Sequence, residues 1–192
     1  MNLIRQLFAR FTPSPKKPNY QIDELLYLND WETYASLLNT TDILVLREVF
    51  IFRAWLYNFA FRRVVADRDE YVEPMLNELF GLLKTLGAGV FLNTRRLELG
   101  NIMPDPVSIR HDTDLLMDLL LERFEEYDGA LITAAGRERA DLQYILGYVN
   151  RQLLKHLNHD PVVTALARNV LLAQMMEDVF LPATDVARKI AK

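Results

Sequence analysis

Apolar side chains recur at every third or fourth position along almost the whole chain, which is the spacing of one face of an α-helix. Signals for β-strands are nearly absent. No run alternates apolar with polar residues, no Asn-Gly or Asp-Gly turn joins two such runs, and only PVSIR, residues 106–110, suggests extended chain. The sequence therefore predicts an all-α protein.

The length of the chain predicts one domain after a short arm. Its 192 residues, of which 51% are apolar, are enough to bury a full core in a single domain. Residues 1–20 read as an amphipathic N-terminal arm followed by a proline-rich linker, TPSPKKP. Residues 21–192 read as an antiparallel bundle of about six to eight helices, because short connections make successive helices antiparallel neighbours.

Gly, Pro and capping residues mark where the helices are expected to begin and end. Gly87 and Gly129 are expected to end two of them, and Pro182 is expected to end the last. The expected helices are residues 22–28, 31–38, 42–69, 73–87, 90–99, 112–127, about 134 or 137 to 157, and 161–182.

Composition removes several classes of chemistry. The absence of cysteine excludes disulfides, thiolate metal sites and cysteine nucleophiles. Nucleophile triads, Gly-rich phosphate loops and metal-ligand clusters do not occur at their required spacings, so we expect no catalytic residues, no metal and no cofactor. A net charge of -4 argues against nucleic-acid binding.

The most hydrophobic window, residues 43–61, has the length of a membrane span. Arg47, Glu48 and Arg53 interrupt it, and a charge is costly at the centre of a bilayer. We therefore expect a buried core helix and no transmembrane segment. Residues 1–18 lack the apolar stretch of a secretory leader, so a soluble, cytoplasmic protein is expected.

A basic face with tyrosines is expected on the helix that ends near residue 157. At 100° per residue, six side chains share one narrow face, and one of them is Asp141. We call the other five the basic-tyrosine stripe: Arg137, Tyr144, Tyr148, Arg151 and Lys155. Such a face suits stacking on bases, binding of phosphates or docking of an acidic partner helix, and it also suits an ordinary solvated surface.

Arg151 and His156 of the same helix form an R-x4-H pattern. The pattern resembles the R-x4-6-H signature of the HEPN family of helical ribonucleases, and Gln152 stands where that family prefers a polar residue such as asparagine. The resemblance implies cleavage of RNA by arginine and histidine from paired protomers. Five helical steps place the two side chains roughly 140° apart around the axis, with His156 beside the core face.

The helix at residues 112–127 carries an opposite charge pattern. Four carboxylates, the acidic stripe, follow one line along it: Asp114, Asp118, Glu122 and Glu125. A solvated face is one interpretation. The acidic stripe also complements the basic-tyrosine stripe, either within one chain or across a two-fold homodimer.

Arg53 projects from the middle of an apolar helix face, where an unpaired guanidinium would be costly. A carboxylate or a bound anion is therefore expected beside it. The two interpretations are a structural ion pair and a site that grips a small acidic or lipid-like ligand.

These features together favour a non-enzymatic protein–protein interaction module, an adaptor or regulator that acts through helix faces. A second copy of the chain is one expected partner, as a homodimer, and residues 1–18 suit weak contact with a membrane surface. The alternatives are a bundle that binds a small acidic or lipid-like ligand near Arg53, and a HEPN-like ribonuclease that uses Arg151 and His156.

Overall fold

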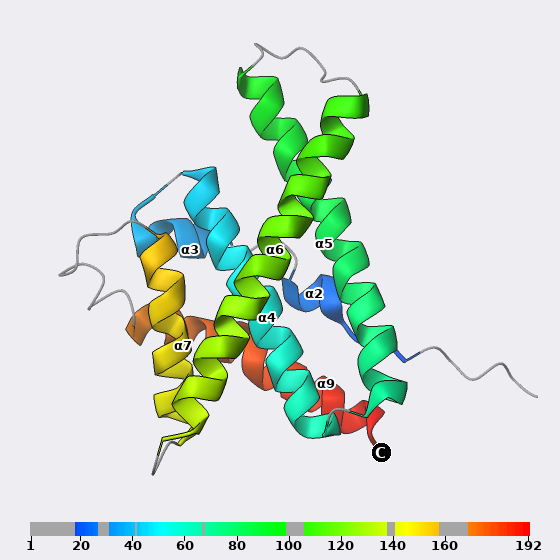
Figure 1. Ribbon diagram of the computed structural model, residues 1–192, viewed down its shortest axis with the longest axis vertical. Helices are drawn as coiled ribbons and strands as arrows, with labels where there is room; N and C mark the ends of the chain where they lie inside the picture. The colour runs from blue at the N-terminus through cyan, green and yellow to red at the C-terminus, as the bar shows by residue number, and fades with distance from the viewer. Residues whose placement is uncertain are drawn as a thin grey trace, which may run out of the picture.

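The computed structural model describes residues 18–26, 31–40, 42–66, 68–98, 106–137, 141–157 and 169–192, and these contain helices and no strand (Figure 1). Their all-α fold, with about seven helices, confirms the fold class. The N-terminal arm up to residue 17 lies outside the described residues. The elements are α2 (Ile22–Leu26), α3 (Trp31–Leu38), α4 (Ile43–Val65), α5 (Asp69–Glu98), α6 (Pro106–Ala135), α7 (Leu142–His156), the π-helical turn η2 (Met176–Phe180) and α9 (Leu181–Ile190).

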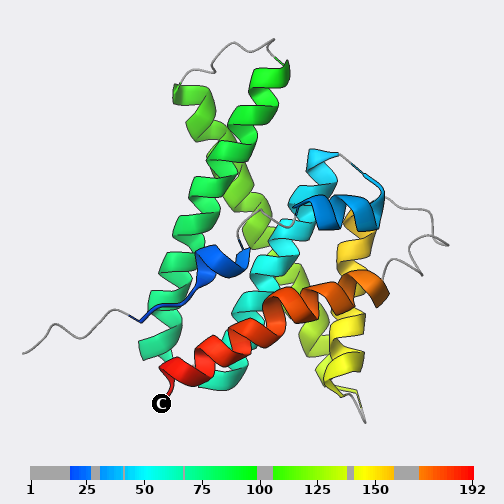
Figure 2. The ribbon, with the colours of Figure 1, turned by 180° about the vertical axis from the view of Figure 1, so that it is seen from behind.

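Helix α4 is the centre of the molecule. Asp42 caps its N-terminus by accepting a hydrogen bond from the Leu44 amide at 2.9 Å, and Ala66 ends it in the left-handed conformation. Every residue from Glu48 to Asn58 is buried, because α6 covers α4 on one side and α9 on the other (Figures 1 and 2). No helix in the described part of the chain is long and apolar enough to cross a membrane.

Helices α5 and α6 form a long hairpin whose far end extends beyond the rest of the molecule (Figures 1 and 2). Three local predictions are wrong here: α5 continues through Gly87, α6 continues through Gly129, and residues 106–110 are helical. A glycine inside a helix costs only about 1 kcal/mol relative to alanine, which a packed apolar face outweighs. Pro106 suits the first turn of a helix, where its missing N–H has no partner.

Pro182 does not end the last helix. It lies at the start of α9, directly after η2, where the Leu181 amide bonds to the Met176 carbonyl. Proline lacks an N–H and its ring clashes with the carbonyl four residues earlier in an α-helix, so the wider π-helical turn accommodates it. The expected start of this helix at residues 160–161 lies outside the described residues.

Helix α7 begins later than predicted. Asp141 is its N-cap and accepts a hydrogen bond from the Tyr144 amide at 2.7 Å, so Asp141 and Arg137 precede the helix and do not lie on its face.

Tyr20, which lies shortly before α2, is buried. Its carbonyl accepts a 2.6 Å hydrogen bond from the Tyr57 hydroxyl, and its ring meets Phe61 edge-on. The segment before α2 is therefore packed into the core from Tyr20 onward.

Candidate functional site

The structure brings together three members of the basic-tyrosine stripe. The guanidinium carbons of Arg137 and Arg151 lie 5.4 and 5.7 Å from the centre of the Tyr148 ring, which is cation–π distance. Tyr144 and Lys155 are exposed, and Lys155 donates a hydrogen bond to Gln152. The arginines thus contact the ring of their own chain, and the binding role of the stripe stays a prediction.

Arg151 and His156 lie in different surroundings. His156 Nε2 is 2.7 Å from Glu126 Oε2 on α6, and four-fifths of its side chain is buried. Arg151 is exposed. The histidine of the R-x4-H pattern is thus held between α6 and α7, and the ribonuclease reading stays a prediction.

The acidic stripe faces solvent along α6. All four of its carboxylates are exposed, and Glu122 pairs with the neighbouring Arg123 at 2.8 Å. Among the described ion pairs, none joins the acidic stripe to the basic-tyrosine stripe. The ion pair that links α6 with α7 uses Glu126, one position beyond the acidic stripe.

Arg53 is buried, with 3% of its surface exposed. Its Nη2 donates a 3.0 Å hydrogen bond to the Leu25 carbonyl, and its guanidinium carbon lies 4.9 Å from the centre of the Tyr34 ring. These contacts join α4 to α2 and α3. Arg53 lines none of the three hollows described below.

Polar contacts between distant helices are the features that sequence reasoning missed. Glu48 in α4 accepts a 2.9 Å hydrogen bond from Arg123 Nε in α6, and both side chains are largely buried. Burial by itself would lower the pKa of Arg123, but the hydrogen bonds and charges of Glu48 and Glu122 outweigh it and raise that pKa. Glu48 had been visible only as a charge that interrupts an apolar window.

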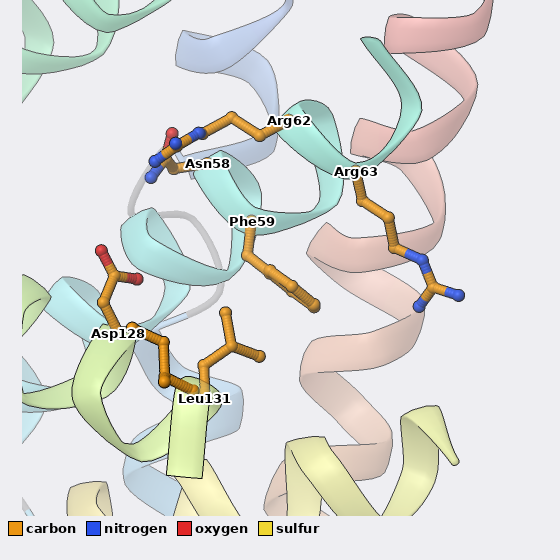
Figure 3. A pocket seen from close by; sticks show the side chains of 7 residues that line it. Asn58, Phe59, Arg62, Arg63, Asp128 and Leu131 are labelled. Atoms are coloured by element: carbon orange, nitrogen blue, oxygen red, sulfur yellow. The ribbon is translucent and has the colours of Figure 1, made fainter. Parts of the chain in front are cut away.

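A surface hollow of about 340 Å³ lies between the C-terminal halves of α4 and α6 (Figure 3). We call it the Asn58 hollow, and it is lined by Asn58, Phe59, Arg62, Arg63, Asp128, Leu131 and Ile132. Asn58 and Arg62 lie four residues apart on α4, and in Figure 3 their side chains extend to the same side of the view as the Asp128 carboxylate. Phe59 and Leu131 fill the middle, and Arg63 points away toward the other side. The hollow thus has a polar end and an apolar wall.

Two contacts hold the wall of the Asn58 hollow in place. Trp55 Nε1 donates a 2.8 Å hydrogen bond to Asp128, which ties α4 to α6. The Trp55 ring stacks on Phe59, with ring centres 5.4 Å apart and planes only 3° from parallel. Asn58 is 4% exposed, and its Oδ1 has no hydrogen-bond partner among the described residues. The wall of the hollow therefore contains a residue with a buried acceptor, and that oxygen has almost no accessible surface of its own.

Two further hollows adjoin the first one. The second, of about 510 Å³, is lined by Arg63, Val64, Leu142, Phe180, Leu181, Thr184, Asp185 and Arg188. The third, of about 400 Å³, is lined by Leu142, Gln143, Leu146, Leu172, Ala173 and Met176. Arg63 lines the first two and Leu142 the last two, so the three hollows are neighbours on the surface. We call them the groove, which crosses α4, α6, α7, η2 and α9.

Comparisons of the chain with protein-family models, with curated proteins and with solved structures find no match. Within the described residues, no group of three or more His, Asp or Glu side chains is placed to hold a metal ion.

Proposed function

We propose that the chain is a non-enzymatic protein–protein interaction module, an adaptor or regulator, and that its partner binds in the groove. The observation that carries the proposal is a row of three neighbouring hollows, in each of which apolar side chains line part of the wall. Ile132 and Leu181, which belong to the groove lining, are 72% and 54% exposed. Apolar surface of this kind with a polar rim is typical of sites for protein partners.

The shape and charge of the groove favour an amphipathic segment of the partner. A groove between helices suits a helix that lays its apolar face into it. Arg62 and Arg63 border the groove. Its two carboxylates are already engaged: Asp128 accepts a hydrogen bond from Trp55, and Asp185 forms an ion pair with Arg188 at 3.1 Å. The border is thus more basic than this acidic chain as a whole, and we expect acidic residues on the partner beside its apolar face.

Substitutions in the groove test the proposal. Ile132→Asp and Leu181→Asp place charges in the groove, while Leu115→Asp and Leu121→Asp are matched controls on α6, at leucines that are about half exposed and line none of the hollows. Proteins retained by the wild type are identified by mass spectrometry, and the purified partner is titrated calorimetrically. We expect each groove variant to weaken its binding about 10-fold or more, and the controls to bind normally. Equal effects of groove and control variants would contradict the proposal.

A bundle that binds a small acidic or lipid-like ligand is a second candidate, and the Asn58 hollow is the observation that favours it. Two arginines and a buried amide line that hollow, so the ligand would bind there and not at Arg53. Native mass spectrometry of the purified protein tests this candidate. Added mass that is lost on denaturation would support it, and the same spectrum tests the homodimer, which we also propose.

A further inference from the structure

We propose that the Asn58 hollow binds the carboxyl-terminal residue of a polypeptide. In this proposal Asn58 Oδ1 accepts the backbone N–H of that residue, Arg62 binds its carboxylate, and Phe59 and Leu131 contact its apolar side chain. The inference rests on the proposed function, because it names the part of the partner that enters one end of the groove.

Asn58 supplies the first argument. A buried oxygen without a hydrogen bond costs about 1–3 kcal/mol, so native proteins rarely leave one without use. This oxygen belongs to a side chain that is 4% exposed and that lines the hollow. The oxygen has almost no accessible surface where it lies, so a donor reaches it when the carboxamide rotates about its terminal bond, and a peptide N–H is a donor that an apolar hollow can admit. A ligand with only a carboxylate would leave the oxygen unsatisfied.

Arg62 supplies the second argument. It follows Asn58 by four residues on α4 and lines the same hollow, so a carboxylate on its guanidinium lies close to the group that Asn58 binds. A guanidinium has five N–H donors in a fork that matches a carboxylate, and Arg62 also has an interaction within its own chain. Asp128 opposes an anion at this end, but it already accepts a hydrogen bond from Trp55 Nε1. The hollow as a whole is lined by two arginines, Arg62 at the polar end and Arg63 on the other side, and by one carboxylate, so it favours a single negative charge.

The apolar wall and the size of the hollow supply the third argument. Phe59 and Leu131 occupy its middle, next to the polar end (Figure 3). Its volume of about 340 Å³ is near the lower end of the roughly 300–1,000 Å³ typical of ligand sites. One amino-acid residue with an apolar side chain is a ligand of that size. A carboxylate, an amide N–H and an apolar side chain occur together at the C-terminus of every polypeptide that ends in such a residue.

The first experiment uses N-acetyl-L-leucine and N-acetyl-L-leucinamide as probes. The two differ in the carboxylate alone, and both retain the amide N–H and the side chain. Binding is followed by two-dimensional ¹H–¹⁵N NMR, in which the indole N–H of Trp55 reports directly because it bonds to Asp128 at the hollow. The chain has two tryptophans, so the indole signal is assigned with one Trp31→Phe variant. We expect the acid to shift the Trp55 signal and to bind at least 10-fold more tightly than the amide.

Variants separate the roles of the two polar groups. Asn58→Leu removes the acceptor, and Arg62→Gln removes the charge; we expect each to weaken N-acetyl-L-leucine at least 5-fold. Lys84→Gln on α5 is the control for loss of one positive charge, because Lys84 is exposed and lines none of the hollows. Equal affinity of N-acetyl-L-leucine and N-acetyl-L-leucinamide would overturn the proposal. So would tighter binding of L-leucinamide, whose free amino group is positively charged, than of N-acetyl-L-leucine.

A second comparison identifies the source of the ligand. An acetylated pentapeptide, Gly-Gly-Ala-Ala-Leu, with a free carboxyl group is titrated beside N-acetyl-L-leucine. Tighter binding of the pentapeptide supports a polypeptide C-terminus, whereas equal affinity points to a small N-acyl amino acid and overturns the polypeptide source. If the acid probe fails while Ile132→Asp still abolishes partner binding, this inference fails and the proposed function stands. If the probe binds as described and groove variants leave every partner unaffected, the proposed function fails instead.

Discussion

Glu48 and Arg123 are the largely buried charges whose loss has the clearest expected effect. Their side chains are 6% and 13% exposed, and they join α4 to α6. Glu48→Leu leaves the Arg123 guanidinium without its buried partner, so we expect the free energy of unfolding to fall by about 2–4 kcal/mol in urea denaturation. The double variant Glu48→Leu/Arg123→Met removes both charges. It should be more stable than the single variant, and equal stability of the two would refute this account.

Two buried tyrosine hydroxyls have opposite expected roles. The Tyr127 hydroxyl has no hydrogen-bond partner among the described residues, whereas the Tyr57 hydroxyl donates to the Tyr20 carbonyl at 2.6 Å. Tyr127→Phe should therefore leave the protein equally stable or stabilise it by about 1 kcal/mol, and Tyr57→Phe should destabilise it by about 1 kcal/mol. Thermal unfolding of the two variants measures the difference. A larger loss in Tyr127→Phe than in Tyr57→Phe would show that the Tyr127 hydroxyl is satisfied.

At the same scale, residues differ in how far a sequence can predict their surroundings. Helical spacing placed Arg53 on an apolar face, and the side chain is buried there. The sequence around Asn58, five positions later, does not indicate that the side-chain oxygen of this residue lacks a hydrogen-bond partner. The hydrogen bond from Trp55 to Asp128 spans 73 residues, and the spacing of side chains within one helix does not report which distant helix packs against it. The Asn58 hollow could therefore be found only in the fold.

At the scale of the element, the interior glycines of α5 and α6 have a measurable cost. A Cβ added at Gly81 or at Gly129 would meet no atom within 4 Å. Gly81→Ala and Gly129→Ala should each stabilise the protein by about 0.5–1 kcal/mol, because alanine loses less backbone freedom in a helix. The midpoint of urea unfolding measures this, and the double variant should show the sum because the sites lie on different helices. Destabilisation by either alanine would mean that the helix is interrupted at that glycine.

The ends of the helices differ in how far the sequence predicts them. Asp42 caps α4 through a side-chain hydrogen bond within two residues, and local reasoning located it, whereas Asp141 caps α7 in a similar way and was missed. Gly129 and Pro182 are ambiguous locally, because packing of the flanking turns decides whether a helix continues through them. The number and class of helices were thus predictable, while the lengths of α5 and α6 depended on contacts between elements.

At the scale of the whole molecule, buried tyrosines make stability sensitive to alkaline pH. Burial, with the charge of Glu78, raises the pKa of Tyr20 and Tyr57 above the ordinary value of 10.0, and burial with the charge of Glu48 raises that of Tyr127. The folded state therefore keeps protons that the unfolded state loses. Stability is unaffected below about pH 10 and should fall above it by about 1.4 kcal/mol per pH unit for each such tyrosine.

Urea unfolding at a series of pH values from neutral to alkaline checks this slope. Tyr127→Phe removes one of the three contributions, so its slope above pH 10 should be smaller than that of the wild type. Tyr144→Phe is the matched control for the loss of a tyrosine hydroxyl, because Tyr144 is 37% exposed. Identical slopes in the wild type and in Tyr127→Phe would contradict the assignment.

The burial of α4 on all sides has a consequence for the order in which the protein can be made. A ribosome releases α4 more than a hundred residues before α9, so the apolar side that α9 covers has no cover until those residues have been made. This part of the core is therefore finished only after release of α9. A chain that stops after α7 should emerge with that side bare, and we expect it to need a chaperone where a chain that includes α9 does not.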